Sequence, residues 1–229
     1  MPNIDPKLLK LLSQWDTPTI CNGLKSIDNS LTDKGFTTRT MFCASPELSP
    51  IVGFARTAKI RSREPTSLCG DDQREINVKY YNHMAELPAP TIAIIEDLDN
   101  PVGLGAWWGE VHTNIHSALG SLGVVTNGSI RDLDVNAKEF QLLAGGISPS
   151  HAHVHVVDVA CNVEIFSMKV SPGNIIHADR HGAVVIPPDA LPQLPSAIRE
   201  LIAKEETILN ATREKDFDIK RLLDVMGLQ

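Results

Sequence analysis

The apolar positions change their spacing several times along the chain, and each change marks a predicted element. Residues 5–15 place leucines at helical spacing after an Asp-Pro pair, which suits a cap and a first helical turn. A second helix is predicted to begin within "DTPTICNGLK", where Asp16 or Thr17 can cap it and Pro18 fits its first turn. Residues 28–50 are polar and rich in Pro, Ser and Thr, which indicates a loop.

The middle of the chain predicts a strand, a helix and a second strand. "TIAIIED" (91–97) is a continuous apolar run, typical of a buried parallel strand. A glycine-rich loop follows, and apolar residues within 110–122 then recur at helical spacing. "GVVTNG" (123–128) reads as a short second strand. The three segments form a βαβ unit with a right-handed crossover.

Further strand and helix patterns surround this unit. "IVGFARTAKIRS" alternates like a strand, and residues 74–86 have a helical pattern. "HVHVVDV", "NVEIFSMKV" and "NIIHADRHGAVVIP" predict additional strands, and residues 189–226 predict a helix after a proline-rich lead-in. We therefore expect one α/β domain over residues 1–229, with flanking N- and C-terminal helices.

Composition narrows the classes of partner. The chain has 229 residues, of which 42% are hydrophobic and 21% charged, so an ordinary buried core is expected. The formal net charge is -7 and the basic residues are scattered, which argues against a nucleic-acid partner. No apolar run approaches the length of a membrane span, and the N-terminus lacks a signal-peptide pattern. The four cysteines show no CxxC spacing, so we expect reduced thiols in a cytoplasmic protein.

One edge of the predicted parallel sheet gathers polar residues. Ligands of such sheets sit beyond the carboxyl ends of the strands. Asp97 and Asp99 follow the first strand of the βαβ unit, the helix of residues 110–122 begins near the same edge, and Arg131 and Asp132 follow the second strand. The first amides of a helix lack intrahelical partners and favour an anion.

These residue types suit a carboxylate and a hard cation. A carboxylate could lie on the helix amides and pair with Arg131, whose planar fork matches it in a bidentate way. Glu110 and Asp132 add oxygen ligands that suit Mg²⁺ or Mn²⁺. The alternative is a surface turn in which Arg131 and Asp132 form only a local ion pair.

The motif "WGE", the 21 residues 110–130 and then the Arg-Asp of "NGSIRD" resemble the RraA-like family. That family includes 4-hydroxy-4-methyl-2-oxoglutarate aldolases and regulators of ribonuclease E activity, and its members often carry demethylmenaquinone methyltransferase labels. "WDTPTICNGL", "IVGFARTAKI" and "VSPGNIIHADRHGAVVIP" also resemble it, so the likeness covers about residues 15–190. It implies a swivelling β/β/α domain, with a C-terminal helical segment over 189–229, in a ring-shaped homotrimer or homohexamer.

The resemblance also implies an activity. The implied enzyme is a divalent-metal-dependent class II pyruvate aldolase, which is a carbon–carbon lyase. It would cleave a 4-hydroxy-2-oxo acid such as 4-hydroxy-4-methyl-2-oxoglutarate. Decarboxylation of oxaloacetate could occur at the same site. The resemblance implies that Asp132 binds the metal and that Glu110 holds a metal-bound water. It implies that Arg131 binds the 2-oxo acid and stabilises the enolate. The pyruvate carboxylate would be bound by the amides around Gly109, Val111 and His112.

The family also implies an alternative, a non-catalytic regulator that binds ribonuclease E or another protein partner. Asp132 beside Arg131 favours the lyase, because a pure regulator has no need of a metal ligand there. A methyltransferase is not expected, since no nucleotide-binding glycine-rich loop directly follows an N-terminal strand. His112 stands where the family usually has leucine, and the stretch "GGISPSHAHVHVVD" is unlike the family's, so the substrate stays open.

Several other polar residues have two interpretations. His151, His153 and His155 alternate, so on a strand they would share one face. That face could form a zinc site, or it could simply face solvent or a neighbouring subunit. We prefer the solvated or subunit-facing interpretation, because no Cys or carboxylate follows at ligand spacing. We expect structural roles for the group His177, Asp179 and His181. Trp107 and Trp108 could line a pocket or an interface, and the acidic residues of the C-terminal helix could form a solvated face or reach a neighbouring site: Glu205, Glu206 and Glu214.

Overall fold

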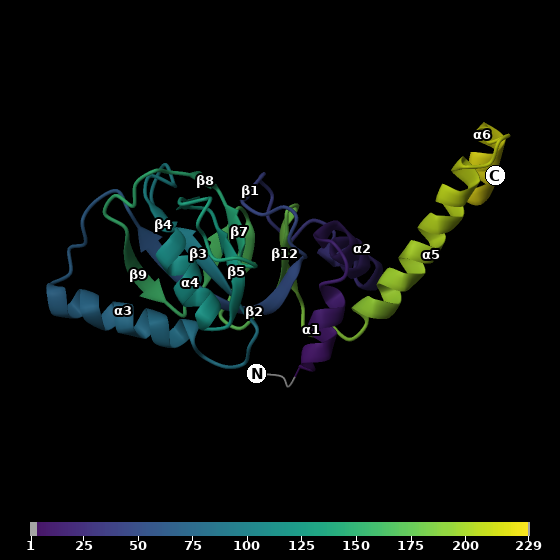
Figure 1. Cartoon of the computed structure of the whole chain (residues 1–229). Helices are drawn as coiled ribbons and strands as arrows, with labels where there is room; N and C mark the ends of the chain where they lie inside the picture. Colours follow the sequence, from purple (N-terminus) through teal and green to yellow (C-terminus); the bar gives the residue numbers. More distant parts are fainter. Residues whose placement is uncertain (1–3, 229) are drawn as a thin grey trace.

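A curled eight-stranded sheet forms the centre of the molecule in the computed structural model, which describes residues 4–228 (Figure 1). Along the sheet the order is β1-β7-β5-β3-β2-β12-β13, and β9 also pairs with β2. β2, β3, β5 and β7 run parallel, and the other neighbours are antiparallel. The strands are β1 Phe42–Cys43, β2 Ile51–Arg61, β3 Thr91–Asp97, β5 Ser121–Thr126, β7 Gln141–Ala144, β9 His155–Val159, β12 Ile175–Asp179 and β13 Gly182–Ile186.

The predicted βαβ unit is confirmed. β3 and β5 are parallel neighbours, with Ile94 opposite Val125, and helix α4 (Glu110–Ala118) connects them. The helix is shorter than the predicted 110–122. Gly120 adopts φ +88, a left-handed conformation that favours glycine, and β5 begins immediately after it.

A second, small parallel sheet was not predicted. Its strands are β4 (Ala106–Trp108), β6 (Ser129–Ile130) and β8 (Gly146–Ile147), in that order in space. β4 lies inside the segment that the sequence indicated as a glycine-rich loop. Strands of two or three residues are too short to show an alternating pattern, which explains the omission.

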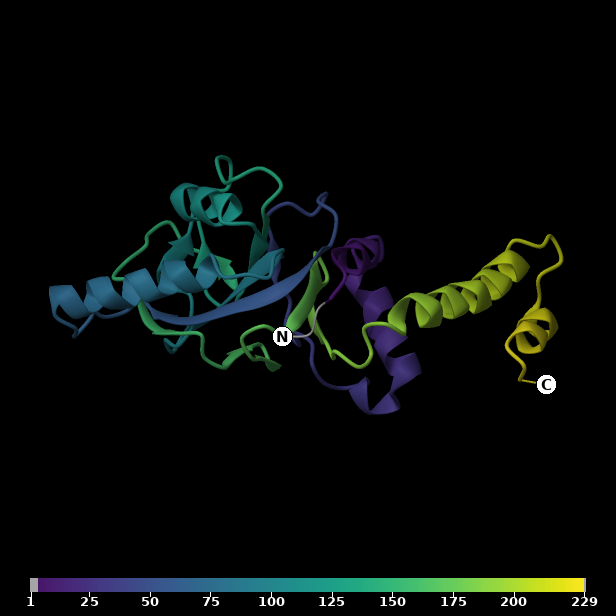
Figure 2. The same cartoon turned by 90° about the horizontal axis from the view of Figure 1, so that it is seen from below.

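Two layers cover the two faces of the main sheet. Successive side chains of β3 point to opposite faces, so Ile92 and Ile94 belong to one core and Ala93 and Ile95 to another. The first core is closed by the hairpin of β10 (Val163–Ile165) and β11 (Met168–Val170). The second is closed by helix α3 (Gly70–Met84) together with residues around α4, on the face away from the hairpin (Figure 2).

The N-terminal helices pack against the end of the sheet formed by β12 and β13. They are α1 (Pro6–Leu12) and α2 (Thr17–Ile27), followed by the short 3-10 helix η1 (Asn29–Leu31). Asp16 caps α2 by accepting from the Thr19 amide at 2.9 Å, as the sequence predicted. Leu12, Ile20 and Leu24 are buried here.

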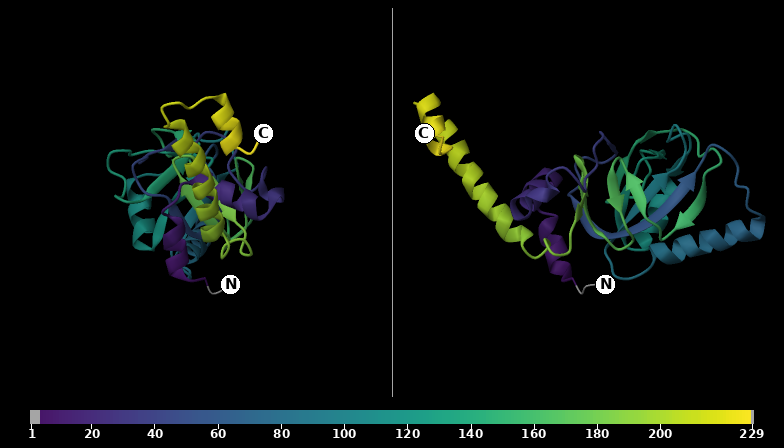
Figure 3. Two further views of the ribbon diagram at one scale, coloured as in Figure 1. Left: turned by 90° about the vertical axis from the view of Figure 1, so that its right-hand side faces the viewer. Right: turned by 180° about the vertical axis from the view of Figure 1, so that it is seen from behind.

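The C-terminal segment forms two helices rather than the predicted single one. α5 (Leu194–Thr212) begins against α2 and then extends away from the body, and α6 (Ile219–Val225) folds back beside its end (Figures 1 and 3). Asp218 caps α6 by accepting from the Arg221 amide at 2.8 Å, which starts a new helix. Within residues 4–228, no helix combines the length and the apolar character that crossing a bilayer requires.

Candidate functional site

The small sheet places the two halves of the predicted site side by side. β4 and β6 are parallel, with Trp108 opposite Ile130, so both strands end at the same edge. The Arg131 amide donates to the Trp108 carbonyl at 2.8 Å, which continues the pairing by one residue. Gly109 and Arg131 are therefore neighbours, and α4 begins directly after Gly109.

Asp132 turns back over the start of α4. Its backbone adopts φ 56, in the left-handed region, and its carbonyl accepts from the Val135 amide at 3.1 Å. Its side-chain Oδ2 accepts from the Glu110 amide at 3.2 Å. A Cβ atom at position 109 would overlap Asp132 Oδ2 and lie 3.2 Å from Arg131 Cγ. A larger residue at position 109 would therefore displace the Asp132 carboxylate from this position.

A side-chain network ties the turn to the helix. The Thr113 hydroxyl lies 3.0 Å from the Gly109 carbonyl, to which it donates, and it accepts from the Ala137 amide at 3.0 Å. The Asn136 amide nitrogen donates to the Arg131 carbonyl at 2.9 Å. These contacts fix the backbone beneath both charged side chains, so the site can be held in one geometry before a ligand arrives.

The charged groups of the site keep unused bonding capacity. Arg131 Nη1 lies 3.6 Å from Asp132 Oδ1, which is longer than a hydrogen bond. Arg131 Nε is buried and has no hydrogen-bond partner among residues 4–228. The two side chains are 36% and 32% exposed, so a small ligand can reach them. An anion at the α4 N-terminus, beside the free amides of Val111 and His112, would meet the Arg131 guanidinium.

Two carboxylates are available for a cation at this edge. Asp132 Oδ1 has no hydrogen-bond donor among residues 4–228, the Asp132 side chain is partly exposed, and the Glu110 side chain is exposed at the first position of α4. In the described part of the chain, no group of three or more His, Cys, Asp and Glu residues is arranged to hold a metal. The residues present fit a hydrated hard cation, because Mg²⁺ keeps several waters and uses one or two protein carboxylates.

His112 lies beside the site on the side of helix α3. Its ring contacts Trp107 in a tilted arrangement with centroids 4.6 Å apart, and its Nε2 is 3.4 Å from the Tyr81 hydroxyl. Burial and then the positive charge of Arg131 lower the pKa of His112 to about 4. The ring is therefore neutral at pH 7.

His116 supports His112 from the next helical turn. Its Nδ1 lies 2.6 Å from the His112 carbonyl, and its Nε2 lies 2.7 Å from the Tyr80 hydroxyl. A carbonyl only accepts, so Nδ1 carries the proton and Tyr80 donates to Nε2. Burial lowers the pKa of His116 to about 4. Sequence reasoning missed Tyr80, Tyr81 and His116, although the spacing of four residues between His112 and His116 was a signal that they share a helix face.

The two tryptophans have different surroundings. Trp108 is fully buried and stacks on Phe140 at 5.9 Å, so it belongs to the core and not to a pocket wall. Trp107 is 8% exposed and lines a cavity together with His112. Of the two positions considered from sequence, only Trp107 borders open space next to the site.

Asp97 and Asp99 brace the loop after β3. Asp97 accepts from the amides of Asp99 and Gly103 at 2.9 and 2.7 Å, and Asp99 accepts from the Ser62 and Arg63 amides, both at 2.8 Å. Burial raises the pKa of Asp97. Among the described residues, neither carboxylate forms a hydrogen bond or an ion pair with Arg131 or Asp132. Both have backbone partners, so they shape the edge and need not bind a ligand.

The three alternating histidines do not share a strand face. β9 begins only at His155, and His151 and His153 lie in the preceding turn, where Ala152 adopts φ 47. A turn residue in the left-handed region breaks the alternation on which the prediction rested. The prediction of one histidine-lined strand face is therefore wrong, and all three residues line the cavity that contains Trp107 and His112.

The remaining candidates lie away from Arg131. His177 is buried between Thr17 and the Trp15 carbonyl, and Asp179 accepts from the Thr17 amide at 2.9 Å, which supports the structural roles predicted for them. Glu205 and Glu206 lie exposed on the extended helix α5. Glu214 forms an ion pair with Arg221 at 2.9 Å. None of these glutamates reaches the Arg131 site of the same chain.

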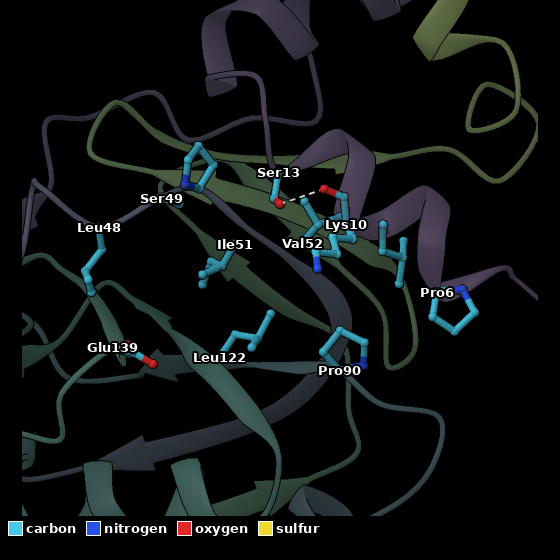
Figure 4. A pocket seen from close by; sticks show the side chains of 12 residues that line it. Pro6, Lys10, Ser13, Leu48, Ser49, Ile51, Val52, Pro90, Leu122 and Glu139 are labelled. Atoms are coloured by element: carbon cyan, nitrogen blue, oxygen red, sulfur yellow. Dashed lines mark hydrogen bonds between the residues drawn. The ribbon is translucent and has the colours of Figure 1, made fainter.

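A cavity of about 600 Å³ lies between α1 and β2 (Figure 4). Pro6, Ile51, Leu122 and Pro90 form much of its wall, and none of the predicted site residues borders it. Lys10 and Glu139 are the ionisable groups among its described lining residues. Its mainly apolar walls offer no arrangement of acid, base and anion-binding groups comparable with the Arg131 edge.

Known proteins share this architecture. A solved structure of an uncharacterized protein from Pseudomonas syringae pv. tomato superposes with TM-score 0.73 at 19% identity, covering 100% of this chain and 96% of that one. Streptomyces coelicolor RraAS2, described as an unusual member of the RNase ES inhibitor RraA protein family, gives TM-score 0.70 at 16% identity, covering 90% and 97%. At these identities the likeness shows the fold.

Sequence comparison adds relatives and a family. Protein MJ0644 of Methanocaldococcus jannaschii is 29% identical over 126 residues, which are 54% of this chain and 59% of that protein. The chain spans less than two thirds of the length of the curated relatives it matches. The profile of the RraA-like family, described as Aldolase/RraA, matches residues 17–185. With its mixed α/β fold, its curled sheet and its flanking helices, the chain belongs to the Aldolase/RraA family.

Proposed function

We propose that this protein is a divalent-metal-dependent carbon–carbon lyase that releases pyruvate from a 4-hydroxy-2-oxo acid, with oxaloacetate decarboxylation at the same site. One observation carries the proposal. An arginine with a buried, unpartnered Nε lies beside the half-exposed carboxylate of Asp132, which itself accepts from the first amide of α4. The family description joins aldolases with RraA proteins, which supports a lyase without deciding it.

The proposed roles follow from the positions of the groups. The substrate carboxylate lies on the amides after Gly109, at Val111 and His112, where the helix N-terminus attracts negative charge. The guanidinium of Arg131 then lies beside the 2-oxo oxygen. Breaking the C3–C4 bond sends its electron pair toward this oxygen as an enolate, and Arg131 stabilises the charge that develops.

Proton transfer is assigned to Glu110. Its exposed carboxylate stands at the first turn of α4, at the mouth of the site. Through a water molecule it accepts the proton of the C4 hydroxyl as the C3–C4 bond breaks, and C3 of the enolate later takes up a proton to give pyruvate. In oxaloacetate the bond breaks with loss of CO₂ and needs no such base.

Asp132 is proposed to hold the divalent metal, Mg²⁺ or Mn²⁺, with Glu110 binding through water. Such a cation supplies Lewis-acid stabilisation of negative charge on the substrate oxygens. Asp132 keeps Oδ1 available while its Oδ2 is oriented by the Glu110 amide. The orientation of a ligand by a neighbouring donor is what a metal site requires of its supporting residues.

A regulatory role is the alternative. The net charge of -7 suits a basic protein partner, and RraAS2 is described as a member of an RNase inhibitor family. A regulator that acts by binding, such as one of ribonuclease E, would not depend on the Arg131–Asp132 geometry.

We also propose that the protein is cytoplasmic and that it forms a homotrimer or homohexamer. Light scattering that shows a monomer at micromolar concentration would contradict the proposed oligomer.

The deciding experiment measures pyruvate release. Oxaloacetate and a panel of 4-hydroxy-2-oxo acids are incubated with the full chain, with Mg²⁺ or Mn²⁺ and with a chelator. We expect pyruvate from oxaloacetate and from at least one aldol substrate only when the metal is present. Rates with Mg²⁺ or Mn²⁺ that equal the protein-free background containing the same metal, for every substrate, would reject the lyase, and binding assays with candidate protein partners would then follow.

A further inference from the structure

A second cavity adjoins the proposed site. It has a volume of about 500 Å³ and lies between α3, β4, the first turn of α4 and residues 151–155. This volume falls in the range of small-molecule pockets. His112 belongs both to the cavity wall and to the neighbourhood of Arg131, whose charge acts on its ring. Through His112, which stands in the first turn of α4, the cavity adjoins the helix start where the substrate carboxylate would lie.

Aromatic rings form much of the wall of this cavity. Tyr81, Trp107 and His112 contribute rings, and the rings of Trp107 and His112 are tilted by 43° with centroids 4.6 Å apart. No Lys, Arg, Asp or Glu occurs among its described lining residues. Burial raises the pKa of the Tyr81 hydroxyl, so that group is also neutral at pH 7.

Polar side chains complete the lining. Gln73 and Asn77 on α3 form a hydrogen bond to each other at 3.2 Å, and histidines of the 151–155 segment also line the cavity. A carboxylate that entered this space would lose hydration beside aromatic rings and side-chain amides, with no lysine or arginine in the lining to pair with, which is costly. A planar, uncharged ring would instead pack against the aromatic walls, and its transfer from water would cost little free energy.

The geometry points to this cavity as the subsite for an uncharged aromatic ring on C4 of the substrate. The inference rests on the proposed function and gives it a substrate class, 4-hydroxy-2-oxo acids with a C4 aryl group. Cleavage of 4-hydroxy-2-oxo-4-phenylbutanoate breaks the C3–C4 bond, moves the hydroxyl proton to a base and a proton onto C3, and yields benzaldehyde and pyruvate. No oxidant or other co-reactant is needed.

A binding experiment tests the subsite without requiring turnover. The probes are 2-oxo-4-phenylbutanoate and 2-oxoglutarate, neither of which has a C4 hydroxyl to support cleavage, and calorimetry with Mg²⁺ gives the dissociation constants. We expect the aryl probe to bind at least about tenfold more tightly. Equal affinities, or tighter binding of 2-oxoglutarate, would overturn the inference.

Two variants with a matched control locate the effect. Asn77→Trp fills the cavity and is expected to remove the tenfold preference, whereas Val78→Trp adds the same ring on the solvent side of α3, where Val78 is 54% exposed, and should keep it. Gln73→Trp repeats the test if Asn77→Trp melts early. A preference that survives both filling variants would place the ring elsewhere and overturn the inference.

Activity separates this inference from the proposed function. Oxaloacetate has no substituent that enters the cavity, so its decarboxylation reports the lyase alone and should be unchanged in Asn77→Trp. We expect kcat/KM for the phenyl substrate to exceed that for 4-hydroxy-2-oxoglutarate at least tenfold. Turnover of oxaloacetate with the opposite preference would reject the aryl subsite only. Aryl-selective binding without any turnover would reject the lyase only.

Discussion

Two acid-base pairs follow strands in this fold, and their surroundings differ. Asp132 beside Arg131 follows β6, and Asp179 with His181 ends β12. The Asp179 side chain is 5% exposed and accepts from the Thr17 amide at 2.9 Å and from the His181 amide at 2.8 Å. The Asp132 side chain is 32% exposed and accepts one amide at 3.2 Å.

Asp179 has a structural role, whereas Asp132 belongs to the candidate site. Burial alone would raise the pKa of Asp179, but hydrogen bonds from Thr17 and His181 outweigh it, and the pKa is lowered. That carboxylate is committed to joining α2 to the sheet. Asp132 keeps a free oxygen and adjoins an arginine Nε that has no partner in the described residues. Unused bonding capacity, more than the residue types, identifies the site.

Replacing Arg131 should give the largest effect on activity. In Arg131→Lys an ammonium cannot reproduce the fork of the guanidinium, and we expect kcat/KM for pyruvate release to fall at least about 100-fold. The melting temperature should stay within about 2 °C, because the side chain is half-exposed and its Nε has no partner to lose. The matched control is Arg180→Lys in the exposed turn after Asp179, which should leave both quantities unchanged. A similar loss in both variants would contradict the comparison.

Replacing Asp179 should affect stability instead. Asp179→Ala leaves the buried Thr17 amide and the His181 amide without their acceptor, so we expect the free energy of unfolding to fall by about 2–4 kcal/mol. Urea unfolding measures the change. Activity per folded molecule should be retained. A stable Asp179→Ala protein with lost turnover would assign Asp179 to catalysis and remove the distinction drawn here.

Acid should weaken the aromatic region behind the site. Burial lowers the folded-state pKa of His116 to about 4 from 6.5, so the unfolded chain binds more protons between these values. The resulting stabilisation is fully present above pH 6.5 and is lost as the pH falls toward 4. Its size for this buried ring is on the order of 3 kcal/mol.

Urea unfolding of the wild type and of His116→Phe at pH 7 and pH 4.5 checks this sign. The variant should be less stable at pH 7, because the Tyr80 hydroxyl loses its acceptor, yet it should depend less on pH. Identical pH dependence in the two proteins would show that His116 does not titrate in this way.

Adding a methyl group at Gly109 should disturb the site moderately. The new Cβ overlaps Asp132 Oδ2, so Gly109→Ala should displace that carboxylate and lower kcat/KM about tenfold. The backbone at Gly109 is extended, at φ -158, and adds no strain of its own. Gly70→Ala is the control, since its Cβ would meet nothing within 4 Å. Full activity of Gly109→Ala would mean that Asp132 need not hold its observed position.

The smallest expected effect is a change of preference. His112→Leu removes one neutral polar ring from the wall beside Arg131, and we expect the ratio of specificity constants among substrates to change a few-fold, with oxaloacetate least affected. Specificity constants across the panel measure it. A large and equal loss for every substrate would make His112 part of the catalytic machinery.

Much of the fold was predictable because its elements carry strong local patterns. The apolar run of β3, the cap Asp16 and the βαβ unit all appear as expected. The strands β4 and β6 were not predictable, because two or three residues show no period, yet they bring Gly109 beside Arg131. The His151–His155 alternation misled for a related reason, since Ala152 turns the chain where a strand was expected.

Asp132 is proposed to serve a metal-dependent reaction at an edge that contributes little to the stability of the fold. The most direct measurement is pyruvate release from oxaloacetate by Asp132→Ala during a Mg²⁺ titration, with a melting curve of the same sample. We predict turnover at least about 100-fold below wild type at every Mg²⁺ concentration, with a protein that still folds and melts no more than about 5 °C lower, the difference coming from the left-handed backbone and the lost bond to the Glu110 amide. Wild-type turnover by Asp132→Ala at saturating Mg²⁺ would contradict the metal-lyase account and favour the regulator.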